Sequence, residues 1–466
     1  MSSKSPLPLY ALFGANSISL LGSQVTLIAV PWYVLVTTGS AAKTGMTGFA
    51  EALGVVLSGF AGGTLVDRLG HKRASVLADI GSALAIGLIP ILASTTGLAF
   101  WQLLVLVFLG STCNTPGITA RKALIPQLSR LAGTSLERAN ATIQTIQRGA
   151  SMIGSPLAGI LVAMLGASHV LWIDSASFLV SAMMIGSLVP RAKPHDATTR
   201  LAVTKVSLRD ELTTGMSFIW RDKLLFTVVA TIAAGNFLES PLFAVVLPTF
   251  VQRTFGDATV LGILLSCLGG GSVAGAVLLG VFGKRLPRRA TFNTCFILLG
   301  LAYCGLVWLP PLGICAGLLA LAGLAAGPIN PIMATIQHER VPAELMGRVF
   351  GATTSLSYAA IPLGVLGGGL VVQWLGVQPT LAIIAGGYLL TAAGFLVNPT
   401  MKGMSGMGPS RLLADRDKPG RHAGEDHAEG EEHGHQHRGG GQEVGPGGAW
   451  VIGDRAGTRP DQVTNG

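Results

Sequence analysis

Charged residues are scarce in this sequence. Asp, Glu, Lys and Arg make up 12% of the 466 residues, about half of the roughly 25% share that soluble globular proteins carry. Aromatic residues add only 6%. Half of the residues are apolar, and the mean hydropathy is +0.57. This composition excludes a disordered chain, a fibrous protein and an ordinary soluble enzyme, and it predicts an integral membrane protein.

Cysteine is scarce as well. The chain has five cysteines, all in apolar stretches, and no two of them form a CxxC pair. We therefore expect small buried apolar side chains rather than a disulfide framework or a zinc site. Glycine, with 63 residues, has about twice its usual share of ~7%, as is typical of helices that pack closely in lipid.

Common enzyme motifs are missing. The sequence has no GxxxxGK[ST] run, which would cradle a nucleotide phosphate, and no HExxH pair, which would hold a catalytic zinc ion. We predict that the protein is not an enzyme, that it is not an ATP-driven pump on its own, and that it needs no cofactor.

Twelve segments are apolar enough for a membrane span, which requires about 20 residues. They cover about residues 8–36, 43–65, 75–95, 99–120, 139–165, 169–189, 224–251, 258–282, 291–310, 312–335, 349–374 and 377–398. The first stretch is too long for the apolar core of a signal peptide, so we interpret it as a retained span.

Lys and Arg concentrate in alternate loops. With the N-terminus in the cytoplasm, the inner loops hold 20 of these residues and the outer loops hold two, Lys43 and Arg253. Cytoplasmic loops carry such an excess. We predict a multi-pass protein of the cell membrane (inner or plasma membrane) with both termini in the cytoplasm, and we assign the basic charge to these loops rather than to a nucleic-acid-binding surface.

The chain repeats itself. Residues 67–73 after the second span match residues 283–289 after the eighth, and Pro126 after the fourth span matches Pro342 after the tenth. The sequence therefore predicts two similar six-span halves in the same orientation, with the solute site between them. The predicted domains are an N-terminal half at 1–190, a cytoplasmic linker at 191–223, a C-terminal half at 224–400 and a disordered tail at 401–466.

Three groups of residues resemble one known family. Residues 63–73, Gly-Thr-Leu-Val-Asp-Arg-Leu-Gly-His-Lys-Arg, resemble the G-x-L-x-D-R-x-G-R-K/R-R loop of the major facilitator superfamily. Span five is similar to the antiporter motif of that superfamily through Gly154, Pro156 and Gly159. The segments at 40–41, 172–180 and 340–349 resemble its branch of macrolide, tetracycline and enterobactin exporters.

This resemblance covers about residues 8–398. It implies an all-α membrane protein with twelve transmembrane helices in two six-helix pseudo-repeats around a central cavity. It also implies export of a small molecule in exchange for protons, and a monomer without nucleic-acid partners, which acts on a small-molecule substrate and protons within the lipid bilayer.

The sequence departs from the family pattern at three places. Ser155 stands where the antiporter motif usually has glycine, and Gly283 replaces Asp67 in the repeat. The fourth span, ended at residue 120, lacks the buried Arg of many drug–proton antiporters, since Arg121 and Lys122 come at its inner end. This last difference argues against carrying over the proton relay of those antiporters.

The loop after span two has a gating role by resemblance. Asp67 would pair with helix ends or basic groups of the other half when the cytoplasmic side is closed, and Gly63 and Gly70 allow close helix approach and a tight turn. The alternative for Arg68, Lys72 and Arg73 is ordinary positive charge on a cytoplasmic loop.

Ionisable residues inside the spans are the sharper signal, because each costs about 2.5–3.5 kcal/mol near a helix centre. We find Glu51, Asp79, Arg148, Asp174 and Glu239. Arg148 and Glu239 belong to opposite halves near mid-depth. We predict proton coupling by Glu239 first and Glu51 second, with Arg148 as a partner or as an anion-binding residue; satisfied structural pairs are the alternative.

The other two buried charges have structural interpretations. Asp79 lies near the inner end of span three, and we expect it to pair with the basic cluster at 68–73. Asp174 begins span six near the outer face, and we expect it to hold that helix in place.

Polar and aromatic residues near these charges are candidates for the substrate cavity; the alternative for each is helix packing. Those predicted to line the cavity are Asn16, Gln24, Trp32, Gln144, Gln147, Asn236, Phe237, Phe243, Asn330 and Tyr358.

The tail from about residue 402 is polar and glycine-rich, which predicts disorder. It contains His422, His427, His433, His435 and His437 among acidic residues. Such groups can bind Zn²⁺ or Ni²⁺, but the tail has no cysteine and no fixed ligand spacing. We therefore expect a solvated tail, with metal sensing as the alternative.

The leading prediction is a secondary transporter that exports lipophilic drugs or similar molecules by proton antiport and alternating access. The alternative within transport is an exporter of a siderophore or metal chelate, for which Arg148 would suit an anionic solute. A third interpretation, a non-transporting receptor or scaffold, fits less well because charges embedded in a membrane are costly without a transport cycle.

Overall fold

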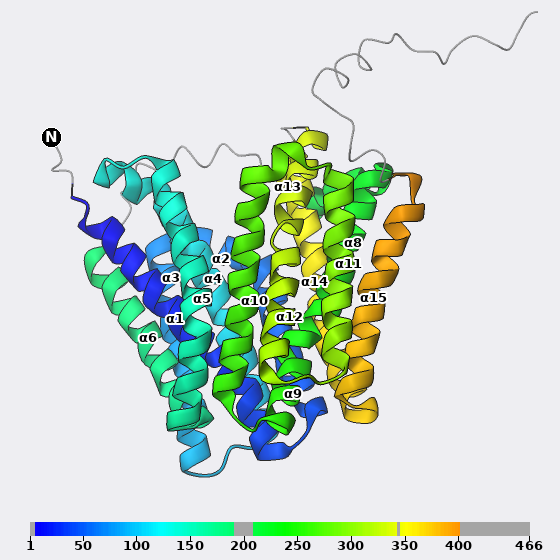
Figure 1. Ribbon diagram of the computed structural model, residues 1–466. Coiled ribbons are helices and arrows are strands. Elements are labelled where there is room, and N and C mark those ends of the chain that lie inside the picture. Colours follow the sequence, from blue (N-terminus) through cyan, green and yellow to red (C-terminus); the bar gives the residue numbers. More distant parts are fainter. Residues whose placement is uncertain (1–4, 191–207, 343–344, 401–466) are drawn as a thin grey trace, which may run out of the picture. The chain divides into compact units, whose positions relative to one another are not determined.

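The computed structural model describes residues 5–190, 208–342 and 345–400. All regular secondary structure in these ranges is helical (Figure 1). Eleven helical segments among the described residues are long and apolar enough to cross a membrane. The twelfth is α2 (Ala41–Leu69), whose 29 residues are also enough to cross a membrane. The prediction of an all-α membrane protein with twelve spans is confirmed.

The helices of the first half are α1 (Leu7–Thr38), α2, α3 (His71–Ser94), α4 (Phe100–Ala132), α5 (Leu136–Leu165) and α6 (Ala167–Leu188). The second half contains α8 (Lys223–Pro241), π-helical η3 (Leu242–Val246), α9 (Leu247–Thr254), α10 (Ala258–Phe282), 3-10 helical η4 (Gly283–Arg285), α11 (Arg288–Val307), α12 (Leu312–Ala326), α13 (Ile329–Arg340), α14 (Met346–Leu375) and α15 (Val377–Val397). The segments α8–η3–α9 and α12–α13 each make up one span.

Short signals in the sequence set the helix boundaries. Gly39 ends α1 with a left-handed backbone (φ 64°), which glycine adopts without strain. Asp222 begins α8 and accepts hydrogen bonds from the amides of Leu224 and Leu225. Pro241 has no N–H to donate, and the chain continues from it as a π-helical segment inside the seventh span.

Two boundaries differ from the sequence prediction. Helix α4 continues to Ala132, about twelve residues beyond the predicted end of span four. The predicted linker at 191–223 contains an amphipathic helix, α7 (Leu208–Arg221), which packs on α8 and α14 through Ile219. Residues 191–207 and the predicted disordered tail lie outside the described residues.

Each half has its own helix packing, and the repeat predicted from the sequence is visible in it. In the first half α1 packs on α5 and α6, and α3 packs on α4 and α6. In the second half α8 packs on α14, α10 on α12, and α11 on α15. Between the halves the main contacts are α2 with α14 and α5 with α10 (Figure 1). The two contacts are equivalent, because α2 corresponds to α10 and α5 to α14 in the repeat.

These two contacts between the halves are made by glycine. A Cβ atom built on Gly45 would lie 2.7 Å from the Cα of Gly369, and one built on Gly262 would lie 2.6 Å from the carbonyl oxygen of Ser155. Gly159 faces Gly262 with similarly short distances. The helix backbones therefore touch directly, as in other close helix pairs in lipid. Gly45 and Gly262 lie near the starts of α2 and α10, and Gly159 and Gly369 lie near the ends of α5 and α14. We call this end of the bundle the closed end.

A side-chain clamp adds to the contact at the closed end. The amide oxygen Oε1 of Gln373 on α14 accepts hydrogen bonds from the Ser40 hydroxyl at 3.1 Å and from the Ala42 amide at 3.3 Å. Ser40 is also the N-cap of α2, because its hydroxyl accepts from the Lys43 amide. The start of α2 is thereby held to the last turn of α14.

At the other end the same helix faces are apart. Residues spaced by three or four share a helix face, so Gly63 continues the face of Gly45, Gly351 that of Gly369, and Gly269 that of Gly262. A Cβ atom built on Gly63, Gly351 or Gly269 would meet open space. The halves therefore touch at the closed end and separate toward the end that holds Asp67, which we call the Asp67 end.

A small substitution on α10 tests this packing. We expect Gly262→Ala to lower the melting temperature in detergent by several degrees, because the new methyl group collides with the α5 backbone and overpacking typically costs about 1–3 kcal/mol. Gly269→Ala, on the same face but in open space, is the matched control and should leave the melting temperature unchanged. Equal effects of the two variants would contradict the arrangement.

Candidate functional site

The gating motif lies on the exposed last turn of α2 and the turn that follows. Gly70 has a positive φ of 79°, its amide donates to the Val66 carbonyl, and α3 begins directly after it. Asp67 and Arg68 are exposed, and Asp67 has no ion-pair partner among the residues that the structure describes. The family motif is thus presented at the end where the halves are apart, free of the predicted contact.

The antiporter-like motif packs α5 between two other helices. A Cβ atom on Gly154 would lie 2.9 Å from the Gln24 side chain on α1, and Gly159 faces α10. Pro156 lies inside the helix between them. Ser155 is buried and its hydroxyl donates to the Ser151 carbonyl at 3.0 Å. Gly262 on α10 provides the space beside this turn, so the serine fits where the family usually has glycine.

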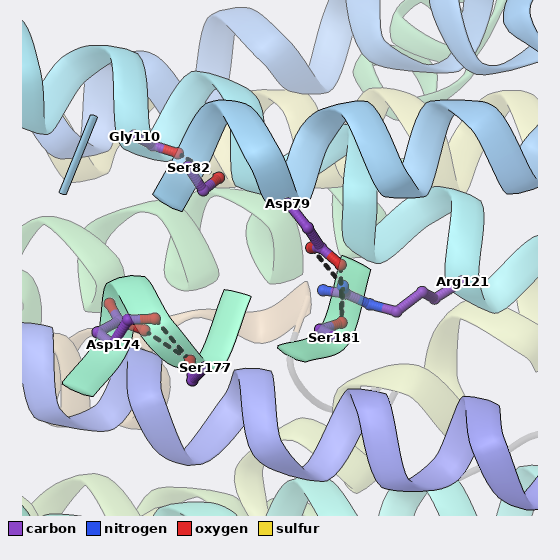
Figure 2. A network of polar contacts seen from close by, with 7 residues as sticks. All are labelled: Asp79, Ser82, Gly110, Arg121, Asp174, Ser177 and Ser181. Carbon is purple, nitrogen blue, oxygen red and sulfur yellow. Dashed lines mark hydrogen bonds and ion pairs between the residues drawn. The ribbon is translucent and has the colours of Figure 1, made fainter. Parts of the chain in front are cut away.

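A buried ion pair joins α3 and α4. Arg121 Nη1 lies 2.7 Å from Asp79 Oδ1, and the side chains are 2% and 0% exposed. The second oxygen of Asp79 accepts from the Ser181 hydroxyl on α6, also at 2.7 Å (Figure 2). Both carboxylate oxygens are thereby satisfied and the charge is neutralised inside the first half.

This ion pair corrects two sequence predictions. Asp79 pairs with Arg121 and not with the basic cluster at 68–73. Arg121 is a buried residue inside α4 rather than a loop residue, because the helix continues through it to Ala132. The fourth span therefore does carry a buried arginine. The sequence signal that would have found it is the apolar run at 123–126, which follows Lys122 and extends the span.

A second buried carboxylate, Asp174, lies on α6 with hydroxyl partners. Thr26 Oγ1 on α1 donates a hydrogen bond to Asp174 Oδ2, and Ser177 Oγ lies 3.2 Å from Oδ1. The residue is 1% exposed. Figure 2 shows Asp174, Ser177 and Ser181 following one another along α6 toward the Asp79–Arg121 pair. Glu51 on α2 is half-buried and close enough to Asp174 for an electrostatic interaction. Sequence reasoning did not single out Thr26, Ser177 or Ser181.

Glu239 and Arg148 lie in different surroundings. Glu239, on α8, is close enough for electrostatic interaction with the buried tyrosines Tyr303 on α11 and Tyr388 on α15, whose rings pack edge to face at 5.4 Å. The Tyr303 hydroxyl has no hydrogen-bond partner in the described structure. Arg148 is exposed on the face of α5 that turns toward α10. The ion pairs of the described residues do not include Arg148 with Glu239.

Two of the predicted cavity residues continue the faces along which the halves separate. Gln144 lies four residues before Arg148 on the face of α5 that turns toward α10, and Tyr358, which is 48% exposed, continues the face of Gly369 on α14. Both lie on the Asp67 side of the closed contacts. Their contact with a solute stays a prediction.

The other predicted cavity residues are spread over α1, α5, α8, η3 and α13. Asn236 Nδ2 donates to the Ser357 carbonyl on α14 at 3.0 Å. Asn16 is buried, and its Nδ2 atom has no partner in the described structure. The exposed ones are Phe237 and Asn330; Gln24, Gln147 and Phe243 are half-buried, and Trp32 packs inside the hydrophobic core.

The buried ion pair generates a stability prediction. We expect Arg121→Met to destabilise the protein strongly, because removing one partner of a buried pair typically costs about 3–5 kcal/mol. The double variant Arg121→Met with Asp79→Asn should recover part of the melting temperature, since it leaves no unpaired charge. Glu339→Gln breaks the exposed 2.8 Å pair with Arg288 and should have little effect. An unchanged melting temperature in Arg121→Met would refute a structural role of the ion pair.

The chain matches known transporters over most of its length. The family model of the Major Facilitator Superfamily matches residues 12–365 and 229–407. The multidrug efflux pump Tap of Mycolicibacterium fortuitum is 31% identical over 377 residues, which are 80% of this chain and 91% of Tap. Macrolide efflux protein A of Streptococcus pyogenes is 24% identical over 384 residues, 80% of this chain and 91% of that protein.

A solved structure shows the same fold. The crystal structure of a mutant of the nucleoside transporter NupG aligns with a TM-score of 0.71 at 14% identity, and covers 83% of this chain and 98% of that one. The prediction of a transporter rather than an enzyme is confirmed by the family match and by these relatives. The chain belongs to the Major Facilitator Superfamily, in the branch that contains these drug-efflux proteins.

Proposed function

We propose that the protein exports lipophilic, drug-like molecules in exchange for protons, by alternating access. Membership in the drug-efflux branch supports export. The observation that carries the mechanism is the asymmetry of the two inter-half contacts, which are closed by glycine at one end and apart at the Asp67 end. A carrier that alternates needs such faces, because it must close them at one end while it opens them at the other.

The glycine faces are suited to a reversible contact. Gly63 on α2 and Gly351 on α14 lie on the faces that Gly45 and Gly369 use at the closed end, and both meet open space. Flat faces without interlocking side chains separate and close again without unpacking a core. Rocking the halves would bring Gly63 and Gly351 together and would place Asp67 against the second half.

The direction of the state follows from the loop charges. The Asp67 end carries the basic loops, and such loops lie in the cytoplasm, so we assign the described state as open to the cytoplasm. In this state an exporter takes up its solute. Gln144 and Tyr358 then face the entering solute, and the aromatic ring of Tyr358 offers stacking to a flat lipophilic molecule.

Proton coupling requires a buried carboxylate that exchanges a proton during the cycle. Glu239 and Glu51 remain our candidates from the sequence, and Glu239 lies inside a span near the buried rings of Tyr303 and Tyr388. Arg148 does not neutralise Glu239 in the described state. It is exposed on an inter-half face, where an anionic solute group would meet it.

That position of Arg148 supports a second candidate function. A siderophore or metal chelate carries anionic groups, and an exposed guanidinium on the α5 face binds such groups by paired hydrogen bonds. The two candidates differ in the charge of the solute. An Arg148→Gln variant should lose export of an anionic chelate and keep export of a cationic dye.

Dye efflux from cells tests the proposal. Cells that make the wild type should export a lipophilic cationic dye, and a protonophore should abolish the export. We expect Glu239→Gln to lower the efflux rate at least tenfold, because the amide cannot release a proton. Glu339→Gln, which removes an exposed carboxylate outside the site, is the matched control. Wild-type export that persists with the protonophore would refute proton antiport.

Cross-linking of the closed end tests alternating access. The Gln373 clamp brings α2 and α14 together, so a short bifunctional thiol reagent should join Ser40→Cys to Gln373→Cys in the described state. The cross-linked double variant should lose transport more than tenfold, because the closed end cannot open. Each single variant with the same reagent is the control. Full transport by the cross-linked protein would contradict alternating access.

A further inference from the structure

The first half contains two buried carboxylates that differ in how their charge is balanced. Asp79 has the guanidinium of Arg121 at 2.7 Å and the Ser181 hydroxyl at the same distance. Asp174 is as deeply buried, but the partners that the structure gives it are the hydroxyls of Thr26 and Ser177. An ionised carboxylate without a cation is costly inside a membrane protein, and it is cheaper when protonated.

Among the described residues, the charged groups on the helices around Asp174 form no ion pair with it. Helix α2 contributes Glu51, which is close enough to interact with Asp174 as a like charge. Helix α3 contributes Asp79, whose charge Arg121 of α4 neutralises. On α5, Arg148 lies on the face toward α10, and α1 contributes the neutral Thr26. Two neighbouring carboxylates without a counter-ion hold a shared proton more readily than two charges.

Helix α1 is pressed against the carboxylate. A Cβ atom built on Gly22 would collide with both Asp174 Oδ1 and Ser177 Oγ, so no larger residue fits at this place. Helix α1 also contacts α9 and α10 of the second half. A movement of the halves against each other would therefore displace α1. This helix carries Thr26, which donates a hydrogen bond to Asp174.

We propose that Asp174 is a proton-exchange site in the first half, and that α1 switches this site through the Thr26 hydroxyl. The proposal rests on proton antiport as the function. One O–H bond forms when a proton from the outer water binds the Asp174 carboxylate, and the same bond breaks when the proton leaves to the cytoplasm. In the described state Thr26 donates to Asp174, and this hydrogen bond favours release of the proton relative to a state in which α1 withdraws the hydroxyl.

This site differs in role from the Asp79–Arg121 pair. Asp79 has both oxygens occupied and a permanent counter-ion, so it holds α3, α4 and α6 together. Ser177 and Ser181 extend from Asp174 along α6 toward that pair (Figure 2), so the two groups share one polar helix face. The exchange site lies on the side of this face that α1 covers.

Transport in proteoliposomes separates the exchange site from the proposed function. Two quantities are measured for a lipophilic cationic dye, namely uphill uptake driven by a pH gradient and exchange across the membrane without a gradient. In Asp174→Asn we expect uphill uptake to fall at least tenfold and exchange to fall less than threefold, because the amide cannot carry the proton while the solute path is intact. Glu339→Gln should change neither.

The hydroxyl switch has its own test, which does not remove a carboxylate. Thr26→Val deletes the donor to Asp174, so the proton is held to higher pH and the pH profile of transport should shift upward. Thr26→Ser keeps a hydroxyl and should restore the wild-type profile. A merely structural threonine would lower the amount of folded protein in Thr26→Val without moving the profile.

The outcomes distinguish the two proposals. If the wild type shows no uptake driven by the pH gradient, proton antiport itself fails and the exchange site fails with it. If the wild type shows such uptake and Asp174→Asn retains it, the exchange site is wrong and antiport stands. If Asp174→Asn does not fold, the pH profiles of Thr26→Val and Thr26→Ser test the proposal instead. An unchanged pH profile of transport in Thr26→Val overturns it.

Discussion

The halves of this protein meet through backbone at one end, and this contact is the constraint on which the rest of the structure depends. Gly45 faces Gly369, and Gly159 faces Gly262, at distances that leave no space for a side chain. Helices this close hold each other by dispersion along flat faces. The same faces continue as Gly63, Gly269 and other glycines that meet open space, so the contact is confined to the closed end.

The buried charged residues of the bundle are of two kinds, paired and unpaired. Asp79 and Arg121 neutralise each other and tie three helices of the first half together. Asp174, Glu51 and Glu239 have no basic partner among the ion pairs of the described residues. A compensated pair is suited to structure, because its protonation changes at great cost. An uncompensated carboxylate is suited to proton exchange, because its two forms are closer in free energy.

The fold was predictable from local properties of the chain. Apolar runs of about 20 residues located the spans, and the spacing of residues 67–73 and 283–289 located the repeat. The end of α4 was missed, because Arg121 and Lys122 interrupt the apolar run before it resumes at residues 123–126, and the pairing of Arg121 with Asp79 explains why the helix continues through them. The prediction that Asp79 pairs with the cluster at 68–73 was wrong for a related reason. The position of Asp79 along α3 does not show that Arg121 of α4 lies beside it.

The sequence by itself determined the class of protein, the number of spans, the twofold repeat and the positions of the ionisable residues within the spans. These properties depend on the free energy of transferring a helix into lipid, which is a sum over neighbouring residues. Only the tertiary structure decided which groups the buried carboxylates meet, because Arg121 meets Asp79 across 42 residues and Thr26 meets Asp174 across 148. The rotation of each helix about its axis sets such contacts, and that rotation results from the packing of all helices together.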